Sequence, residues 1–440
     1  MQSKPSTPLG ALSDNPWSWI PTLYFAEGIP YFIVNIISVI MFTNMGLQNS
    51  IVALLTSLLY LPWVVKPLWS PFVALIRTKR WWIVTMQALV SVSLIFAAIA
   101  LPSQHTLANG AEARFFLLTL CIFYITAFAS STHDIAADGY YMIALDEHRQ
   151  SVFVGIRSTF YRLASIFGQG VLVVIAGVLE NRLGNIPLAW KIMLIICSAM
   201  FALLTIWHSF VLPRPEIVLK EKKTAKEIFK GFGNAIASFA TKKGLGTAII
   251  FMLLYRLPEA FLVKMMNPFL LDSIENGGLG LSTQQVGLVY GTIGVAALTI
   301  GGIVGGLFAG KVGLRRSLLP MAAALALPCG AFVVLAISQT TNIIVIGSCV
   351  AVDQFGYGFG FTAYMLYLMH FSQGELKTSH YSICTAFMAL SMMLPGLVAG
   401  YLEQWLGYVG FFWLVIVCCG VTFATTWKVR GQLSKDSTSC

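Results

Sequence analysis

The chain has 440 residues, of which 57% are hydrophobic and 10% are charged, and its formal net charge at pH 7 is +10. Ordinary soluble domains carry roughly 25% charged residues, so most of this chain's exterior must face something other than water. The composition therefore excludes a set of water-soluble domains and indicates a protein embedded in lipid.

Twelve stretches are long and apolar enough to cross a bilayer as helices. A hydrocarbon core about 30 Å thick requires around 20 mostly apolar residues for each crossing. The stretches are 20–42, 51–75, 81–101, 115–143, 153–179, 188–212, 247–271, 284–309, 317–337, 343–369, 378–401 and 408–427. The segment before the first stretch contains three prolines and a single lysine, which is not the pattern of a cleavable signal peptide. We therefore expect the first span to be retained in the mature protein. The sequence thus predicts an all-α, multi-pass membrane protein.

The basic residues of the loops predict the orientation of the spans, because lysine and arginine are retained on the cytoplasmic side. With both termini inside, most loop lysines and arginines are cytoplasmic, and only Arg114, Arg182 and Lys191 fall outside. We therefore expect a bacterial inner membrane protein with cytoplasmic N- and C-termini. This placement also explains the net positive charge more simply than nucleic acid does, and we expect no nucleic-acid partner.

The longest polar stretch, Pro213–Gly246, divides the chain into two sets of six spans. We predict an N-terminal six-helix bundle at 1–212, a cytoplasmic linker at 213–246, and a C-terminal six-helix bundle with a short tail at 247–440. Hydrophobic residues recur in the linker at helical spacing among lysines, which favours an amphipathic helix on an anionic membrane face over a solvated loop. They are Ile228, Phe229, Phe232, Ile236 and Phe239.

A basic cluster follows the second helix of each half, at Arg77–Arg80 and at Lys311–Arg316. The second cluster ends a glycine-rich helix and resembles the loop signature of the major facilitator superfamily. Both copies lack the signature's acidic residue and have Ala74, and Ala309 or Gly310, in its place. The resemblance implies a substrate site near the membrane midplane, between two halves that expose it alternately to either side.

Ten ionisable residues fall inside the predicted spans. A charge in lipid is costly, so each of these residues is expected to have a charged partner, contact with water or a role in function. The acidic ones are Glu27, Asp134, Asp138, Glu259 and Asp353, and the basic ones are Lys66, Arg157, Arg162, Arg256 and Lys264. Equal numbers of each sign predict internal pairing. Asp134 and Asp138 share one helix face, and the phase of Arg157 and Arg162 lets one of them meet these aspartates while the other faces the cavity. A purely structural ion-pair network is the alternative.

Proline and glycine interrupt spans one, two and seven, which we expect to border the cavity because loosened backbone must be satisfied there. The interrupting residues are Pro21, Gly28, Pro30, Pro62, Pro67, Pro71, Pro258 and Pro268. Aromatic residues, among them Tyr24 and Tyr255, crowd the same spans. Stacking on sugar faces is one use for such side chains, and packing or interfacial anchoring is the other.

Five segments resemble the AmpG-type muropeptide permeases of the major facilitator superfamily. They are Tyr24–Pro30, Lys66–Pro71, Thr132–Tyr140, Tyr255–Glu259 and Met266–Leu270, and the third, T-H-D-I-A-A-D-G-Y, is the most specific. The likeness extends over nearly the whole chain. It implies proton-driven import of N-acetylglucosaminyl anhydro-N-acetylmuramic acid with or without peptide, and the same branch includes acetyl-CoA transporters.

We therefore expect a proton symporter that acts as a monomer on an anionic glycan or glycopeptide, without cofactor, metal or catalytic residue. The cysteine spacing matches no metal site. The expected substrate-binding residues are Arg157, Arg162, Arg256, Lys66, Tyr24, Asn35, Tyr255 and Asn267. The expected proton-coupling residues are Asp134 and Asp138, followed by Glu27 and Glu259.

Three alternatives stay open. The first is a transporter of acetyl-CoA or another anionic solute. The second is a membrane acyltransferase, because His133 and Asp138 have an H-x-x-x-x-D spacing that some acyltransferases use. The third is a signalling protein without transport, which would require a stable partner protein.

Overall fold

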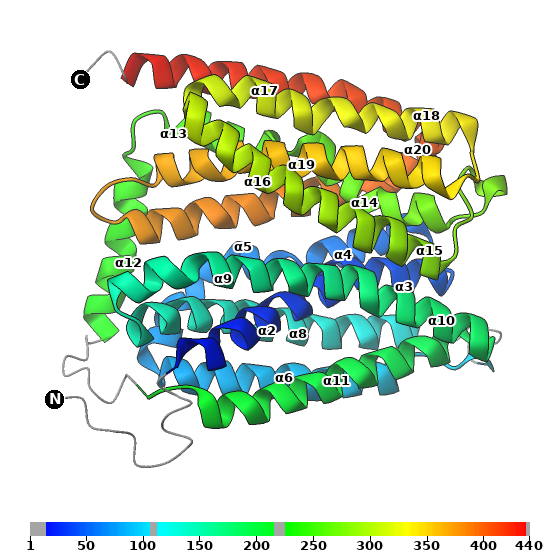
Figure 1. Ribbon diagram of the computed structural model, residues 1–440, viewed down its shortest axis with the longest axis horizontal. Coiled ribbons are helices and arrows are strands. Elements are labelled where there is room, and N and C mark those ends of the chain that lie inside the picture. Colours follow the sequence, from blue (N-terminus) through cyan, green and yellow to red (C-terminus); the bar gives the residue numbers. More distant parts are fainter. Residues whose placement is uncertain (1–14, 106–111, 215–224, 437–440) are drawn as a thin grey trace. The chain divides into compact units, whose positions relative to one another are not determined.

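The computed structural model describes residues 15–105, 112–214 and 225–436, and within these ranges the regular elements are helices, with no strand. Figure 1 shows these helices, coloured along the chain. The predicted all-α membrane architecture is confirmed. The following helices carry the spans and the linker: α2 (Ile20–Phe32), α3 (Ser38–Asn44), α4 (Asn49–Leu58), α5 (Leu61–Leu75), α6 (Lys79–Ala100), α8 (Glu112–Ala144), α9 (Glu147–Ile166), α10 (Val173–Leu183), α11 (Ile186–Val211), α12 (Ala225–Ala240), α13 (Leu245–Leu254), α14 (Leu257–Leu271), α15 (Thr283–Val286), α16 (Val295–Val312), α17 (Leu314–Ala326), α18 (Gly330–Ser338), α19 (Ile343–Phe371) and α20 (Lys377–Asp436).

Eleven continuous helical stretches of the described chain are long and apolar enough to cross a membrane. The last of them, Lys377–Leu433, contains Gly407 at φ 66° and ψ 169°, a conformation outside the helical region. Only glycine adopts such angles without strain, so α20 is two helices joined at this residue. These two helices correspond to the predicted spans 378–401 and 408–427.

The chain divides into two compact units that do not follow a single cut in the sequence. The first unit contains 1–36, 68–168 and 178–229, and the second contains 37–67, 169–177 and 230–440. In the first unit, α6 packs against α8 and α11, and α2 packs against α9 (Figure 1). In the second, α16 and α17 pack against α19, and α4 and α14 pack against α20.

Spans one, two and seven are interrupted, but not at every residue that predicted an interruption. In span one, a π-helical segment at Ile33–Ile37 follows Pro30. Span two breaks between α4 and α5, immediately before Pro62, whereas Pro67 and Pro71 lie inside the continuous α5. Span seven breaks before Pro258, which lies in the first turn of α14, where a missing N–H costs little.

Two further π-helical segments, at Phe167–Leu172 in span five and Gly287–Gly294 in span eight, were not predicted. Glycines allow the backbones of these spans to touch within the second unit. A Cβ on Gly291 would lie 1.8 Å from the carbonyl oxygen of Gln169, and one on Gly177 would lie 2.3 Å from the amide nitrogen of Gln284. Any side chain at either glycine would therefore require the backbones to separate.

The linker contains the predicted helix as α12, which replaces the alternative of a solvated loop. Phe229 and Ile236 are exposed, whereas Phe239 is buried against Phe371 and His380. The exposed apolar side chains suit a membrane surface, although lipid contact stays a prediction. The side chains of Ile228 and Ala74, and the linker lysines within 215–224, lie outside the described residues.

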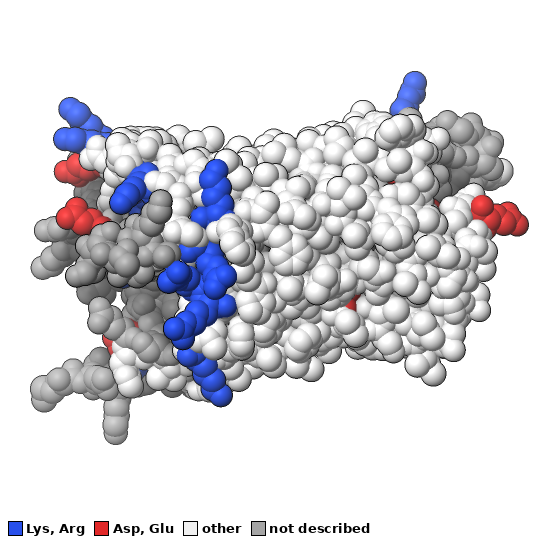
Figure 2. Space-filling model, turned by 90° about the horizontal axis from the view of Figure 1, so that it is seen from above, with Lys and Arg blue, Asp and Glu red and all other residues white. Residues whose placement is uncertain are grey.

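Charged side chains are unevenly distributed on the face shown in Figure 2, which lies over α17, α18 and α20. Lysines and arginines gather toward one end of this face, a wide and almost uncharged surface follows, and a few charged side chains lie at the opposite end. Large apolar side chains of these helices, including Val334, Val417 and Trp427, are more than 60% exposed. An uncharged surface of this kind is stable against lipid and not against water.

Candidate functional site

Arg157 of α9 and Asp138 of α8 form an ion pair in the first unit. The distance from Arg157 Nη2 to Asp138 Oδ1 is 2.6 Å, and the two side chains are 31% and 39% exposed. The guanidinium also lies over the ring of Tyr24, 4.6 Å from its centroid. This pair combines a short contact with partial exposure to solvent, and it joins one of the two predicted arginines to one of the two aspartates.

Glu27 of α2 adds a third carboxyl group to this cluster. It is buried, interacts electrostatically with Asp134 and Asp138, and makes a side-chain hydrogen bond with Asp134. Within the described residues its Oε2 has no hydrogen-bond partner. Because a hydrogen bond between two carboxyl groups requires a proton on one of them, the Glu27–Asp134 contact is a place where the protein can hold a proton.

Glycine on α2 lets this cluster form. A Cβ on Gly28 would lie 2.9 Å from Cβ of Ala164, so a larger residue would push α2 away from α9. Tyr24 packs edge-on against Tyr141, which also faces the Arg157 guanidinium at 5.5 Å. Two aromatic faces therefore hold the cation that pairs with Asp138.

In the second unit, Arg256 and Glu259 form a different kind of ion pair, closed to solvent. Arg256 Nε and Nη2 donate to the two carboxylate oxygens of Glu259 at 2.9 and 3.3 Å, and Nη2 also donates to Tyr357 Oη at 2.8 Å. The two side chains are 5% and 4% exposed. The guanidinium lies 4.7 Å from the ring centroid of Phe361. Its charge is thus neutralised by the protein itself.

The break in span seven explains the position of Arg256. This residue precedes α14 with φ −98° and ψ 12°, and Glu259 lies in the first turn of that helix. A carboxylate is favourable at a helix N-terminus because the first backbone N–H groups are unpaired there. The freed carbonyl of Tyr255 accepts a hydrogen bond from Thr422 Oγ1 at 2.9 Å.

The remaining predicted residues are distributed over both units. Tyr255 is fully buried, donates to the carbonyl of Gly360 at 3.0 Å and stacks on Tyr364. Asn35 is buried in a π-helical segment and donates to the carbonyl of Tyr31 at 3.1 Å. Asn267 is buried, whereas Lys66 and Arg162 are half-buried.

The first unit also contains a chain of buried hydrogen bonds that the sequence analysis did not predict. Gln87 lies 2.9 Å from His133 Nε2 through its amide nitrogen and 2.9 Å from His208 Nδ1 through its amide oxygen. His208 Nε2 in turn lies 2.9 Å from Thr22 Oγ1. The chain joins four spans and positions the residue that precedes Asp134. A search for uncharged polar residues inside the spans would have found it.

His133 and Asp138 have different partners, Gln87 and Arg157. This arrangement does not form the pair that the acyltransferase alternative requires.

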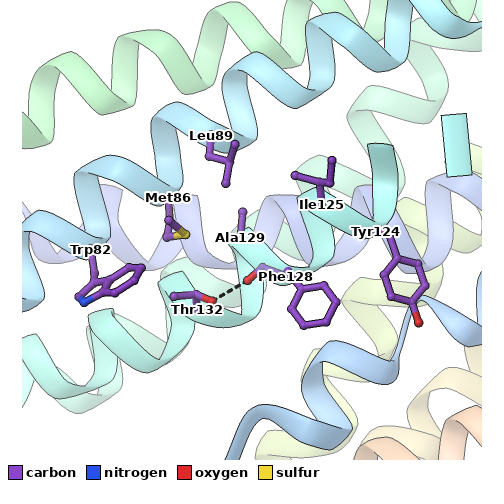
Figure 3. A pocket seen from close by; sticks show the side chains of 8 residues that line it. All are labelled: Trp82, Met86, Leu89, Tyr124, Ile125, Phe128, Ala129 and Thr132. Atoms are coloured by element: carbon purple, nitrogen blue, oxygen red, sulfur yellow. Dashed lines mark hydrogen bonds between the residues drawn. The ribbon is translucent and has the colours of Figure 1, made fainter. Parts of the chain in front are cut away.

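A surface hollow of about 540 Å³ lies between α6 and α8 (Figure 3). Its walls are mainly apolar, and the hydroxyl of Thr132 is bound to the carbonyl of Phe128 at 2.7 Å. Leu89, Ile125 and Phe128 are also among the exposed large hydrophobic residues. The lining suits an alkyl chain better than a polar solute, so we do not assign the solute site to it.

The family model described as Major Facilitator Superfamily matches residues 22–382. The chain therefore belongs to this superfamily and is a multi-pass membrane transporter of a small-molecule substrate.

Two relatives narrow the resemblance. The anhydromuropeptide permease of Escherichia coli (strain K12) is 22% identical over 355 residues, which cover 80% of this chain and 67% of that protein. The Rickettsia typhi protein AmpG 3 is 24% identical over 387 residues, which cover 84% of each chain. The resemblance to AmpG-type permeases is confirmed, at low identity.

Solved transporter structures share the fold of this chain at low sequence identity. The crystal structure of the nucleoside transporter NupG (D323A mutant) matches with a TM-score of 0.70 at 14% identity, covering 94% of this chain and 98% of that one. This likeness supports the fold and not the solute.

Proposed function

We propose that this protein imports anhydro-muropeptides, N-acetylglucosaminyl anhydro-N-acetylmuramic acid with or without peptide, across the bacterial inner membrane by proton symport. The relatives that cover most of the chain include a permease named for anhydromuropeptides, which supports this solute class. The basic loops support a topology with both termini in the cytoplasm. The two six-helix halves, 1–212 and 247–440, are the proposed moving parts.

The observation that carries the proposal is the cluster of Glu27, Asp134, Asp138 and Arg157. It combines a carboxyl–carboxyl hydrogen bond with a half-exposed ion pair on adjoining helices. In our proposal a proton enters at the Glu27–Asp134 contact. The loss of negative charge there weakens the total attraction that the three carboxyl groups exert on Arg157, whose guanidinium then becomes more available to the solute.

Arg162 and Lys66 supply further positive charge in this scheme, and Tyr24 and Asn35 contact the sugars. Arg256, Glu259 and Tyr255 contribute through the buried pair in span seven, which holds the break in that helix. One proton crossing 100 mV supplies about 2.3 kcal/mol. At about 1.4 kcal/mol for each factor of ten, this sustains a nearly 50-fold gradient of a neutral solute.

The test is uptake of labelled N-acetylglucosaminyl anhydro-N-acetylmuramic acid into proteoliposomes, with and without an inward proton gradient. Uptake that the gradient stimulates is the expected result. Uptake that a sodium gradient stimulates, and a proton gradient does not, contradicts the coupling. No uptake by folded protein contradicts the solute, and acetyl-CoA is then the next anion to measure.

A further inference from the structure

Lys264 of α14 is a buried lysine in the second unit whose ammonium has no carboxylate partner among the described residues. Its Nζ donates to Thr56 Oγ1 at 3.0 Å and lies 5.5 Å from the ring centroid of Tyr60. The Thr56 hydroxyl itself donates to the carbonyl of Val52 at 2.6 Å. An ammonium has three N–H donors, so this hydroxyl accounts for one of them.

Two more buried polar groups lie near Lys264 and lack hydrogen-bond partners in the described structure. They are the hydroxyl oxygen of Ser57, a fully buried residue, and the amide oxygen of Asn267, which is 2% exposed. Asn267 is three residues after Lys264 and therefore lies on the same face of α14. We call Lys264, Ser57 and Asn267 the Lys264 cluster.

Gly396 of α20 brings the cluster together. A Cβ at this position would lie 2.2 Å from Ser57 Oγ and 3.1 Å from Lys264 Cε. The hydroxyl and the lysine side chain therefore approach the same point of α20. This approach is possible only because residue 396 has no side chain.

The charge balance of the cluster differs from that of the two arginine sites. Arg157 pairs with Asp138 and Arg256 pairs with Glu259, so the protein neutralises each of these cations. Lys264 has a hydroxyl and an aromatic face instead. A lone ammonium inside a membrane costs about 2.5–3.5 kcal/mol on insertion scales, and such residues usually mark a functional site.

We propose that the Lys264 cluster binds a carboxylate of the transported solute, with Lys264 as its counter-ion and the Ser57 hydroxyl as a hydrogen-bond donor to it, while the Asn267 amide oxygen accepts from an N–H or O–H group beside that carboxylate. The inference rests on the proposed function and narrows it. It assigns recognition of the anionic group in the second unit to Lys264 rather than to Arg256. The sugar rings of the solute bind outside the Lys264 cluster, and tight binding requires the carboxylate of the solute.

The test compares two ligands in each variant: N-acetylglucosaminyl anhydro-N-acetylmuramic acid, and the same disaccharide with its carboxylate converted to a carboxamide. Binding to purified protein is measured by titration calorimetry. In the wild type we expect the acid to bind at least about 30-fold more tightly than the amide, which is the lower end for a buried charge pair. In Lys264→Met we expect most of this preference to be lost, and in Lys264→Arg we expect part of it to be retained.

Exposed Lys428 provides a matched control in the same unit. Lys428→Gln removes one positive charge from the surface and keeps the full preference for the acid. If Lys264→Met retains that preference, the inference is wrong, while the proposed function stands. If folded wild-type protein binds neither ligand, the proposed function is wrong and the inference with it.

If Lys264→Met binds neither ligand, the preference for the acid over the amide is measured in Ser57→Ala instead. This substitution removes one hydroxyl from the cluster and leaves the hydrogen bond from Lys264 to Thr56 in place. We expect it to lower the preference for the acid several-fold while amide binding persists. An unchanged preference in Ser57→Ala contradicts the assignment of the cluster.

Discussion

Replacing Arg256 by methionine should strongly destabilise the protein. The substitution removes two hydrogen bonds to Glu259 and one to Tyr357, all between 2.8 and 3.3 Å. It leaves a carboxylate that is 4% exposed without its counter-ion. Breaking a buried pair in this way typically costs about 3–5 kcal/mol, most of it from the unpaired charge. We expect a loss of this size in the free energy of unfolding.

The measurement is equilibrium unfolding in detergent or bicelles, and Arg149 provides the control. Arg149 pairs with Asp146 at 3.5 Å, but these side chains are 50% and 63% exposed, so Arg149→Met should cost less than about 1 kcal/mol. The double variant Arg256→Met, Glu259→Leu should lose less than the two single losses combined. Equal losses for Arg256→Met and Arg149→Met, or strict additivity in the double variant, would refute the reasoning.

Three further predictions concern coupling, packing and the buried polar chain. Asp134→Asn should abolish gradient-driven accumulation in proteoliposomes but leave solute exchange, and normal accumulation would exclude Asp134 from coupling. Gly291→Ala should reduce the yield of folded protein, because its Cβ would lie 1.8 Å from a carbonyl oxygen, whereas Gly306→Ala, with open space at its Cβ, should not. Equal yields of these two variants would argue against close backbone contact. Gln87→Leu leaves Nε2 of His133 and Nδ1 of His208 without their hydrogen-bond partner, at about 1–3 kcal/mol for each buried group. An unfolding free energy equal to that of the wild type would contradict this role.

The span pattern could be predicted from the sequence because it depends on local composition. Lipid requires about 20 apolar residues in each crossing whatever their neighbours are. The break in span seven could also be predicted, since Pro258 lacks an N–H. The interiors of α5 and α14 were less predictable, because Pro67 and Pro268 lie inside continuous helices.

Within the candidate site, the sequence identified the charged residues but not all of their partners. Helical spacing placed Asp134 and Asp138 on one face, because residues four apart are neighbours on a helix. Only the tertiary structure decided that Asp138 pairs with Arg157 and that Glu27 meets Asp134, since these contacts join different helices. Arg256 and Glu259 are only three residues apart in the sequence, but their burial, in contrast to the partly exposed Arg157–Asp138 pair, was decided by the tertiary structure.

The amino-acid sequence by itself thus determined that the chain is a membrane protein, where its spans lie and which charges lie within them. These properties follow from the transfer of individual side chains between water and lipid. The tertiary structure decided which charges neutralise each other, how Gln87 joins two histidines, and that Lys264 donates to a hydroxyl and not to a carboxylate. Partner choice depends on distances of a few ångströms between residues far apart in the chain, which no local pattern encodes.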